Sequence, residues 1–118
     1  MLSLADKKCV PCDDPDIPKL TLEEAKKYNK QVEGWSLEEV KSHLQISKEF
    51  KFKDFKEALE FVNRVGEISE EQDHHPNIYI LYNRVKIILF THIIRGLHEN
   101  DYIMAAKIDQ ATKNYRPD

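Results

Sequence analysis

Residues 70–92 of the chain read EEQDHHPNIYILYNRVKIILFTH, and three of the five histidines lie near the two ends of this stretch. Pro76 cannot continue a helix, and it disfavours helical geometry at the residue before it, His75. We therefore expect His74, His75 and Pro76 to form a rigid, non-helical corner.

Two apolar runs follow the corner. Their β-branched and aromatic residues predict two strands, over residues 78–82 and 85–90, joined by a tight turn at Asn83-Arg84. A hairpin returns the chain to the point where it began, so Thr91 and His92 should lie beside the corner. The stretch thus predicts a cluster of three histidines.

The sequence on either side of this stretch predicts further helices and strands. Helical apolar spacing covers residues 22–34, 53–72 and 97–112, and strand-like patterns begin at Trp35 and cover residues 44–52. Thr21 and Glu24 fit a capping box before the first helix, and Gly34 tolerates the left-handed geometry that ends helices. The order of elements predicts an α+β fold, an antiparallel four-stranded sheet with helices packed on one face.

The first twenty residues differ in composition from the rest. Residues 1–20 are rich in proline and aspartate, which predicts a flexible amino-terminal arm outside the core and leaves residues 21–118 as a single domain. The arm contains a Cys-x-x-Cys motif, Cys9 and Cys12, which could serve redox chemistry or half a zinc site. A redox motif needs a strand-to-helix context and a structural zinc needs four ligands, so we favour two free thiols.

Length and charge narrow the class of protein. The chain has 118 residues, 41% of them hydrophobic, and a formal net charge of −3 at pH 7, which fits one globular domain without direct nucleic-acid binding. No apolar run approaches the ~20 residues of a membrane span, and no signal-peptide segment is evident, so we expect a cytoplasmic protein without membrane contact. Apolar residues on both faces of the hairpin predict that a second subunit covers it.

The histidine cluster by itself admits three interpretations. The histidines could be structural, as partly buried polar residues often are. Three imidazoles could also bind zinc, although neighbouring histidines at a rigid corner usually point apart. The third interpretation is acid–base chemistry near neutral pH, for which imidazole is suited by its unperturbed pKa of about 6.5.

A family resemblance favours the third interpretation. The sequence resembles the pterin-4a-carbinolamine dehydratases over roughly residues 20–111. The motifs that carry the resemblance are Gly34-Trp35, Phe50-Lys51-Phe52-Lys53-Asp54-Phe55, Asp73-His74-His75-Pro76, Tyr82-Asn83-Arg84-Val85-Lys86-Ile87, Leu89, Thr91-His92, Gly96-Leu97 and Asp101. Three features depart from the family pattern: Ile78 where an aromatic residue is common, His98 where Ser or Thr usually caps the last helix, and the cysteine-containing arm.

The resemblance implies an enzyme that removes water from a 4a-hydroxytetrahydropterin to give the quinonoid dihydropterin. Such an enzyme needs no metal and no cofactor, recycles the pterin of aromatic amino acid hydroxylases, and assembles as a homodimer or homotetramer. Two alternatives are a non-catalytic dimerisation or interaction module, similar to a transcriptional coactivator, and a metal-dependent hydrolase built on the same histidines.

The resemblance also implies which residues form the site. His74, His75 and His92 would be catalytic, and Glu70 and Asp101 would support them. The residues expected to bind substrate are Asp73, His74, His75, Pro76, Phe90, Thr91, His92 and Ile93.

Overall fold

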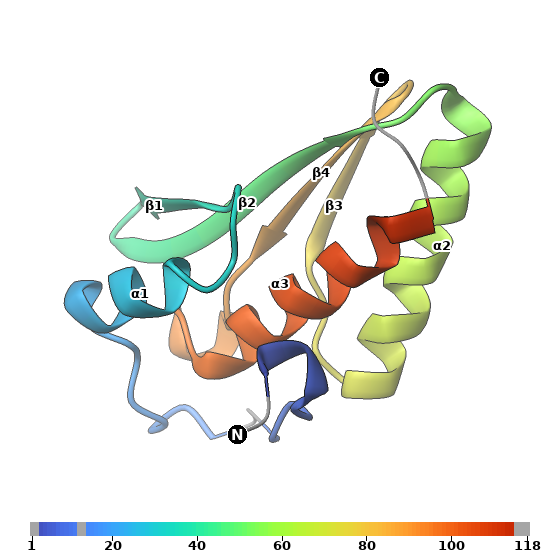
Figure 1. Cartoon of the computed structure of the whole chain (residues 1–118). Coiled ribbons are helices and arrows are strands. Elements are labelled where there is room, and N and C mark those ends of the chain that lie inside the picture. Colours follow the sequence, from blue (N-terminus) through green and yellow to red (C-terminus); the bar gives the residue numbers. More distant parts are fainter. Residues whose placement is uncertain (1–2, 12–13, 115–118) are drawn as a thin grey trace.

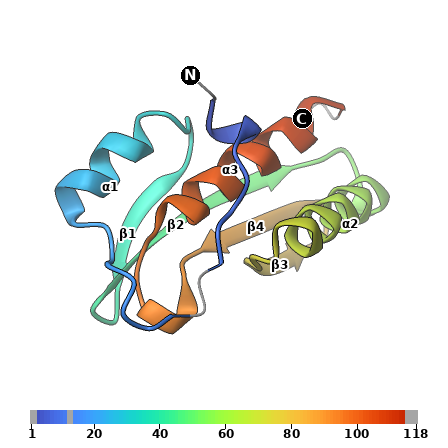
Figure 2. The ribbon, with the colours of Figure 1, turned by 90° about the horizontal axis from the view of Figure 1, so that it is seen from below.

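The computed structural model describes residues 3–11 and 14–114, so Cys12 lies outside the described residues. Four strands form one sheet in the order β1-β2-β4-β3, with every neighbouring pair antiparallel. The helices lie on one face of this sheet (Figures 1 and 2). The main elements are α1 (Leu22–Asn29), β1 (Ser36–Val40), β2 (His43–Lys51), α2 (Phe55–Gln72), β3 (Asn77–Leu81), β4 (Arg84–Leu89) and α3 (Glu99–Ala111); the short 3₁₀ helices are η1 (Leu4–Asp6), η2 (His92–Ile94) and η3 (Thr112–Asn114). The predicted fold class is confirmed.

The core lies between the sheet and the helices. In the central strand β4, Val85, Ile87 and Leu89 alternate with more exposed residues and are completely buried. Residues on β2 pair with them, Ile46 opposite Leu89 and Phe50 opposite Val85, and both are buried against the helices. This alternation is what the sequence pattern of a sheet with one covered face requires.

The predicted element boundaries are correct to within a few residues. The β3–β4 turn lies at Tyr82-Asn83, one residue earlier than expected, with Tyr82 in the left-handed region at φ 54°. The first helix has the predicted capping box at Thr21 but ends at Asn29, because the chain must turn before it can bury Val32 and Trp35 in the core. Gly34 adopts positive φ, but within this turn and not at the end of the helix.

The amino-terminal arm differs from the prediction. Leu4 is only 7% exposed and belongs to the hydrophobic core, and η1 packs on α3, as the blue segment in Figures 1 and 2 shows. The expectation that the arm contributes nothing to the core is therefore wrong for Leu4, because one leucine and a helical turn supply an apolar contact that composition alone does not reveal. The domain boundary at residue 20 remains a prediction.

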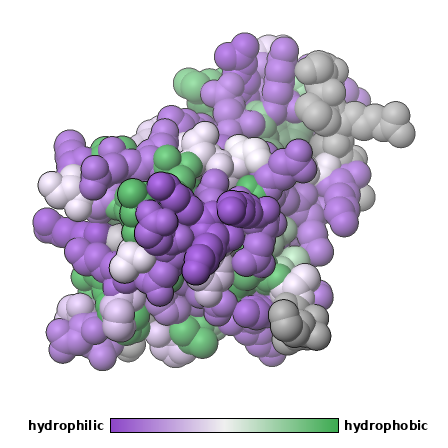
Figure 3. Space-filling view, turned by 60° about the vertical axis from the view of Figure 1, so that its left-hand side comes forward, coloured by the Kyte–Doolittle hydropathy of each residue, from purple (hydrophilic) through white to green (hydrophobic). Residues whose placement is uncertain are grey.

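The surface of the molecule is mostly hydrophilic on the side of α1 and β1, where apolar side chains form only small patches (Figure 3). The edge strand β3 is more apolar: Tyr79 is 51% exposed and Leu81 is 60% exposed. No helix among the described residues is both long enough and apolar enough to cross a membrane.

Candidate active site

The corner begins where α2 ends. Asp73 adopts the left-handed conformation at φ 51° and its backbone N–H donates to the carbonyl of Ser69. The N–H of His74 donates to the same carbonyl, at 3.1 Å, so two amides close the end of the helix. After this turn His74 is 8% exposed while His75 is exposed. The two neighbouring histidines therefore point apart, as the corner predicted.

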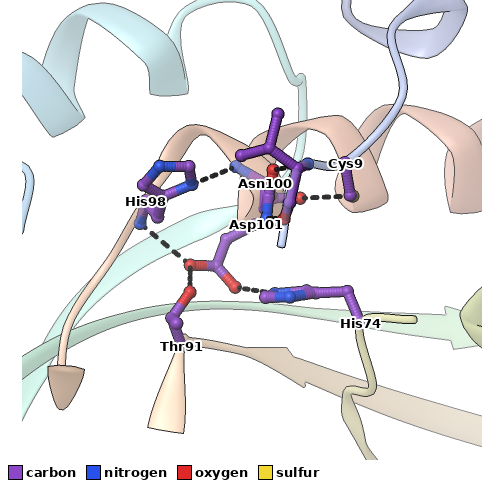
Figure 4. A network of polar contacts seen from close by, with 7 residues as sticks. Cys9, His74, Thr91, His98, Asn100 and Asp101 are labelled. Carbon is purple, nitrogen blue, oxygen red and sulfur yellow. Dashed lines mark hydrogen bonds and ion pairs between the residues drawn. The ribbon is translucent and has the colours of Figure 1, made fainter. Parts of the chain in front are cut away.

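The side chain of His74 ends in a buried hydrogen-bond network (Figure 4). Its Nε2 lies 2.7 Å from Oδ1 of Asp101, whose side chain is completely buried in the first turn of α3. The other carboxylate oxygen, Oδ2, accepts hydrogen bonds from the Thr91 hydroxyl at 2.9 Å and from the His98 backbone N–H at 3.0 Å. We call His74, Thr91 and Asp101 the buried half of the site.

These contacts fix the proton on one nitrogen of His74. A carboxylate oxygen accepts hydrogen bonds, and Oδ2 of Asp101 already accepts two. With Asp101 as a carboxylate, Nε2 of His74 is therefore the donor to Oδ1, and Nδ1 is left for a contact on the cavity side. A carboxylate holds a catalytic imidazole in one tautomer and orientation in the same way in hydrolases.

His75 and His92 lie in more exposed surroundings. Nε2 of His75 is 2.5 Å from Oε2 of Glu70 in the last turn of α2, and the two side chains are 54% and 80% exposed. An exposed pair of this kind orients the ring but adds little stability. We call Glu70, His75 and His92 the rim of the site.

His92 is held by a closed loop and by an aromatic stack. Thr91 and Gly96 form an isolated antiparallel bridge, which closes the loop that contains η2. The ring centroids of His92 and Phe90 lie 4.1 Å apart. The ring of Phe90 also contacts that of His43, with the centroids 4.4 Å apart. The stack extends from the first residue of β2 to the rim.

A cavity of about 350 Å³ brings the three histidines together. Its lining consists of Pro11, Asp73, His74, His75, Phe90, Thr91, His92 and Ile93. Seven of the eight predicted substrate-binding residues are therefore in the lining; Pro76 is absent from it, and Pro11 from the arm is present instead. Glu70 and Asp101 are not in the lining but hold His75 and His74. The volume falls within the range of small-molecule sites.

Comparisons with known proteins establish the family of the chain. The profile of the family described as Pterin 4 alpha carbinolamine dehydratase matches residues 18–111. The chain belongs to the pterin-4-alpha-carbinolamine dehydratase family.

Individual members of the family are similar over most of their length. The chain is 46% identical to a putative pterin-4-alpha-carbinolamine dehydratase of Rubrobacter xylanophilus over 93% of this chain and 99% of that protein. It is 44% identical to one of Alkaliphilus metalliredigens over 93% of this chain and 96% of that protein. A crystal structure of a transcriptional coactivator/pterin dehydratase from Brucella melitensis aligns with a TM-score of 0.72 at 35% identity, covering 80% of this chain and 98% of that one. The prediction of an enzyme, a dehydratase of the lyase class, is confirmed.

Two residues in or beside the candidate site of this dehydratase were not expected from the sequence. Pro11 lies far from the histidines along the chain, and His43 reaches them only through Phe90. The register that pairs Ile46 with Leu89 places His43, at the start of β2, near Phe90, just after the end of β4. Without this register the sequence does not connect His43 to the site. Pro11 gave no signal, because nothing in the sequence states where the arm lies.

Another cavity, of about 510 Å³, lies beside α2 and α3 and is lined largely by charged residues such as Glu60, Arg64 and Lys107. It contains none of the predicted site residues.

Within residues 3–11 and 14–114, no three His, Cys, Asp or Glu side chains are grouped as a metal site requires. The smaller cavity is therefore the candidate active site of this dehydratase.

Two side chains with shifted pKa values, Tyr102 and Glu99, lie near the site but outside the cavity lining. Burial, and then the charge of Asp101, raise the pKa of Tyr102 above its ordinary value, so this side chain is a neutral donor, and its hydroxyl donates to the carbonyl of Ala25. On the adjacent turn, a hydrogen bond from Lys7 lowers the pKa of Glu99. Both groups serve to join α3 to its neighbours.

Proposed function

We propose that this protein dehydrates 4a-hydroxytetrahydropterins to quinonoid dihydropterins by histidine acid–base catalysis. The observation that carries the proposal is the cavity in which three imidazoles meet, one of them held by the buried carboxylate of Asp101. Family membership gives the class of enzyme, and the proposal adds the residues that carry out the reaction.

The reaction needs two proton transfers. The carbon–oxygen bond at the hydroxyl-bearing ring carbon breaks, the adjacent ring nitrogen loses its hydrogen, and a carbon–nitrogen double bond forms as water leaves. An acid must protonate the departing hydroxyl and a base must take the nitrogen proton. Positioned groups of this kind contribute roughly 10²- to 10⁴-fold each. No metal or organic cofactor is required by this scheme.

The surroundings of the three histidines suit different parts of this work. His75 and His92 are exposed, so each can exchange protons with water between turnovers, and we assign the proton transfers to them. His74 has one nitrogen committed to Asp101 and is better suited to orient the substrate and hold it by Nδ1. Both backbone groups of Thr91 pair with Gly96, so we assign the amide edge of the pterin to the backbone on either side of it, within residues 90–93.

The proposal includes a biological setting. The substrate is the form in which aromatic amino acid hydroxylases leave their pterin, so the protein would recycle that cofactor, and we expect it to do so in the cytoplasm. The exposed apolar side chains of the edge strand β3, Tyr79 and Leu81, support assembly into a homodimer or homotetramer. Light scattering at micromolar concentration measures this assembly, and a monomer mass would contradict it.

Stopped-flow absorbance tests the activity. A 4a-hydroxytetrahydropterin is generated in the instrument and its decay is followed with and without the chelator-treated protein. We expect acceleration that chelation leaves intact. If folded protein leaves the buffer rate unchanged, the proposed activity is wrong.

A second candidate function is an interaction module without catalysis. It is favoured by one observation, the words "transcriptional coactivator" that describe the Brucella melitensis protein. The same stopped-flow measurement separates the two, since an interaction module has no need to accelerate the dehydration.

A further inference from the structure

The amino-terminal arm reaches the candidate active site. Pro11 lines the cavity together with the three histidines, although the nearest of them in sequence, His74, is more than sixty residues away. A proline side chain has no donor and no titratable group. Its contribution to a site of this kind is therefore apolar contact, not proton transfer.

The arm is held in place just before Pro11 by two helices. The backbone N–H of Val10 donates to Oδ1 of Asn100 at 3.0 Å, and Nδ2 of Asn100 donates back to the Val10 carbonyl at 2.6 Å. The N–H of Cys9 donates to Oε1 of Gln72 at 2.9 Å. Asn100 is 1% exposed, whereas Val10 is 55% exposed. A buried side-chain amide of α3 therefore anchors the exposed backbone of the arm through two hydrogen bonds.

Further contacts fix the beginning of the arm. Leu4 is buried in the core, Nζ of Lys107 donates to the Ala5 carbonyl at 2.8 Å, and Lys7 forms an ion pair with Glu99 at 3.0 Å. Tyr28 donates its hydroxyl to the same carboxylate oxygen of Glu99. The arm is thus attached at several points between Leu4 and Val10, and these contacts determine the position of Pro11.

One turn of α3 serves both the arm and the histidines. Asn100 holds Val10 and Asp101 holds His74, and Figure 4 shows the arm at Cys9 beside Asn100 and His74 beside Asp101. The side of the cavity that contains Pro11 is therefore fixed relative to His74 by two adjacent residues of α3, Asn100 and Asp101.

We propose that the arm is a built wall of the substrate site, in which Pro11 is a substrate-binding residue and Asn100 is the positioning residue that holds it there. The proposal rests on the proposed dehydratase function and extends it to a segment outside the motifs that carry the family resemblance. Because a fixed apolar wall lowers the free energy of bound substrate and transition state alike, its loss raises KM and leaves kcat almost unchanged.

Three variants and one control test the wall. Pro11→Ala removes the contact directly, Asn100→Ala detaches the arm from α3, and Gln72→Ala weakens its attachment to α2. We expect KM for the 4a-hydroxytetrahydropterin to rise about 3- to 10-fold in Pro11→Ala and Asn100→Ala and less in Gln72→Ala, with kcat within about twofold. Pro15→Ala makes the same chemical change at an exposed arm residue outside the cavity, and it should leave KM unaltered.

Hydrogen exchange tests the attachment without reference to activity. Peptides that cover residues 4–11 should show protected Cys9 and Val10 amides in the unmodified protein, and Asn100→Ala should lose the protection at Val10. The pH profile of kcat should be the same in Asn100→Ala as in the unmodified protein, because the pair of His74 and Asp101 is retained. A changed profile would mean that the substitution acts through Asp101 and not through the arm.

The outcomes separate this inference from the proposed function. If the unmodified protein accelerates dehydration but Pro11→Ala and Asn100→Ala leave KM unchanged, or lower kcat instead, the wall is wrong and the function stands. If the unmodified protein is inactive, the function fails, and titration with 7,8-dihydrobiopterin decides the wall: weaker binding by Pro11→Ala than by Pro15→Ala supports it, and equal binding overturns it.

Discussion

The buried half and the rim of the site hold their histidines by different means. His74 is 8% exposed and donates to a carboxylate that water does not reach, whereas the side chains of His75 and Glu70 are 54% and 80% exposed. Because the pair of His74 and Asp101 is buried, breaking it lowers the stability of the fold. The pair of His75 and Glu70 is exposed and contributes almost nothing to stability. The same residue type is thus a fixed part of the fold on one side of the cavity and a solvent-exchanging group on the other.

The comparison is tested most strongly by removing both rim histidines. His75→Ala combined with His92→Ala should abolish the acceleration of the dehydration, because each proton transfer contributes roughly 10²- to 10⁴-fold. Exposed substitutions usually change the unfolding free energy by less than about 0.5 kcal/mol, so the circular dichroism spectrum and the oligomer should not change. Single variants can be milder, since groups that act together are not additive. A folded double variant with near-normal turnover would falsify the assignment of chemistry to the rim.

A substitution in the buried half should affect stability and activity together. Asp101→Asn keeps the shape of the side chain but presents an amide where a carboxylate accepted from His74, so the imidazole loses its fixed tautomer. We expect turnover to fall about a hundredfold and the unfolding free energy to fall by about 1–3 kcal/mol, read as a lower melting temperature. Thr91→Val, which removes one donor to the same carboxylate, is the matched control and should cost about 1 kcal/mol with a smaller loss of turnover. Unchanged stability in Asp101→Asn would remove the distinction between the two halves.

The aromatic stack links the rim to the rigid sheet. Phe90→Leu should free the ring of His92 and lower turnover about 2- to 10-fold, since an aromatic pair is worth about 0.5–1.5 kcal/mol beyond its area. His43→Leu removes only the outer member of the stack and should have a smaller effect on turnover. Its stability should be equal or higher, because Nε2 of His43 is buried and has no hydrogen-bond partner among the described residues. A drop in melting temperature for His43→Leu would show that the contact of His43 with Phe90 outweighs the removal of the unpaired nitrogen.

The smallest effect is expected at the exposed pair. Glu70→Gln removes the charge that faces His75 but keeps an acceptor at the same place, so stability should change by less than about 0.5 kcal/mol and turnover by about threefold or less. Thermal melts and steady-state rates at two salt concentrations measure both. An effect as large as that of Asp101→Asn would mean that the exposed pair is as important as the buried one.

The two halves also differ in how far the sequence predicted them. The rim is local: Glu70 and His75 lie five residues apart on either side of the end of α2, and the corner at Pro76 and the hairpin follow from residues close in sequence. The buried half needs α3, and only the family resemblance pointed to Asp101; nothing indicated that it would hold His74 in particular. The arm was the least predictable part, because its position depends on the side chain of Asn100 and on the burial of Leu4, which are tertiary contacts without a sequence pattern.

The backbone N–H of His98 donates to Asp101, and Nδ1 of the same residue accepts from the N–H of Asn100. Consecutive residues of an α-helix point about 100° apart, so Asn100 and Asp101 face the arm and the cavity only at one rotation of the helix about its axis. A cap that fixes this rotation does more than stabilise the first turn. A one-residue insertion or deletion between Gly96 and His98 would turn both side chains away from their partners at once. The contact of Asn100 with the arm and the contact of Asp101 with His74 therefore both constrain the length of this connection.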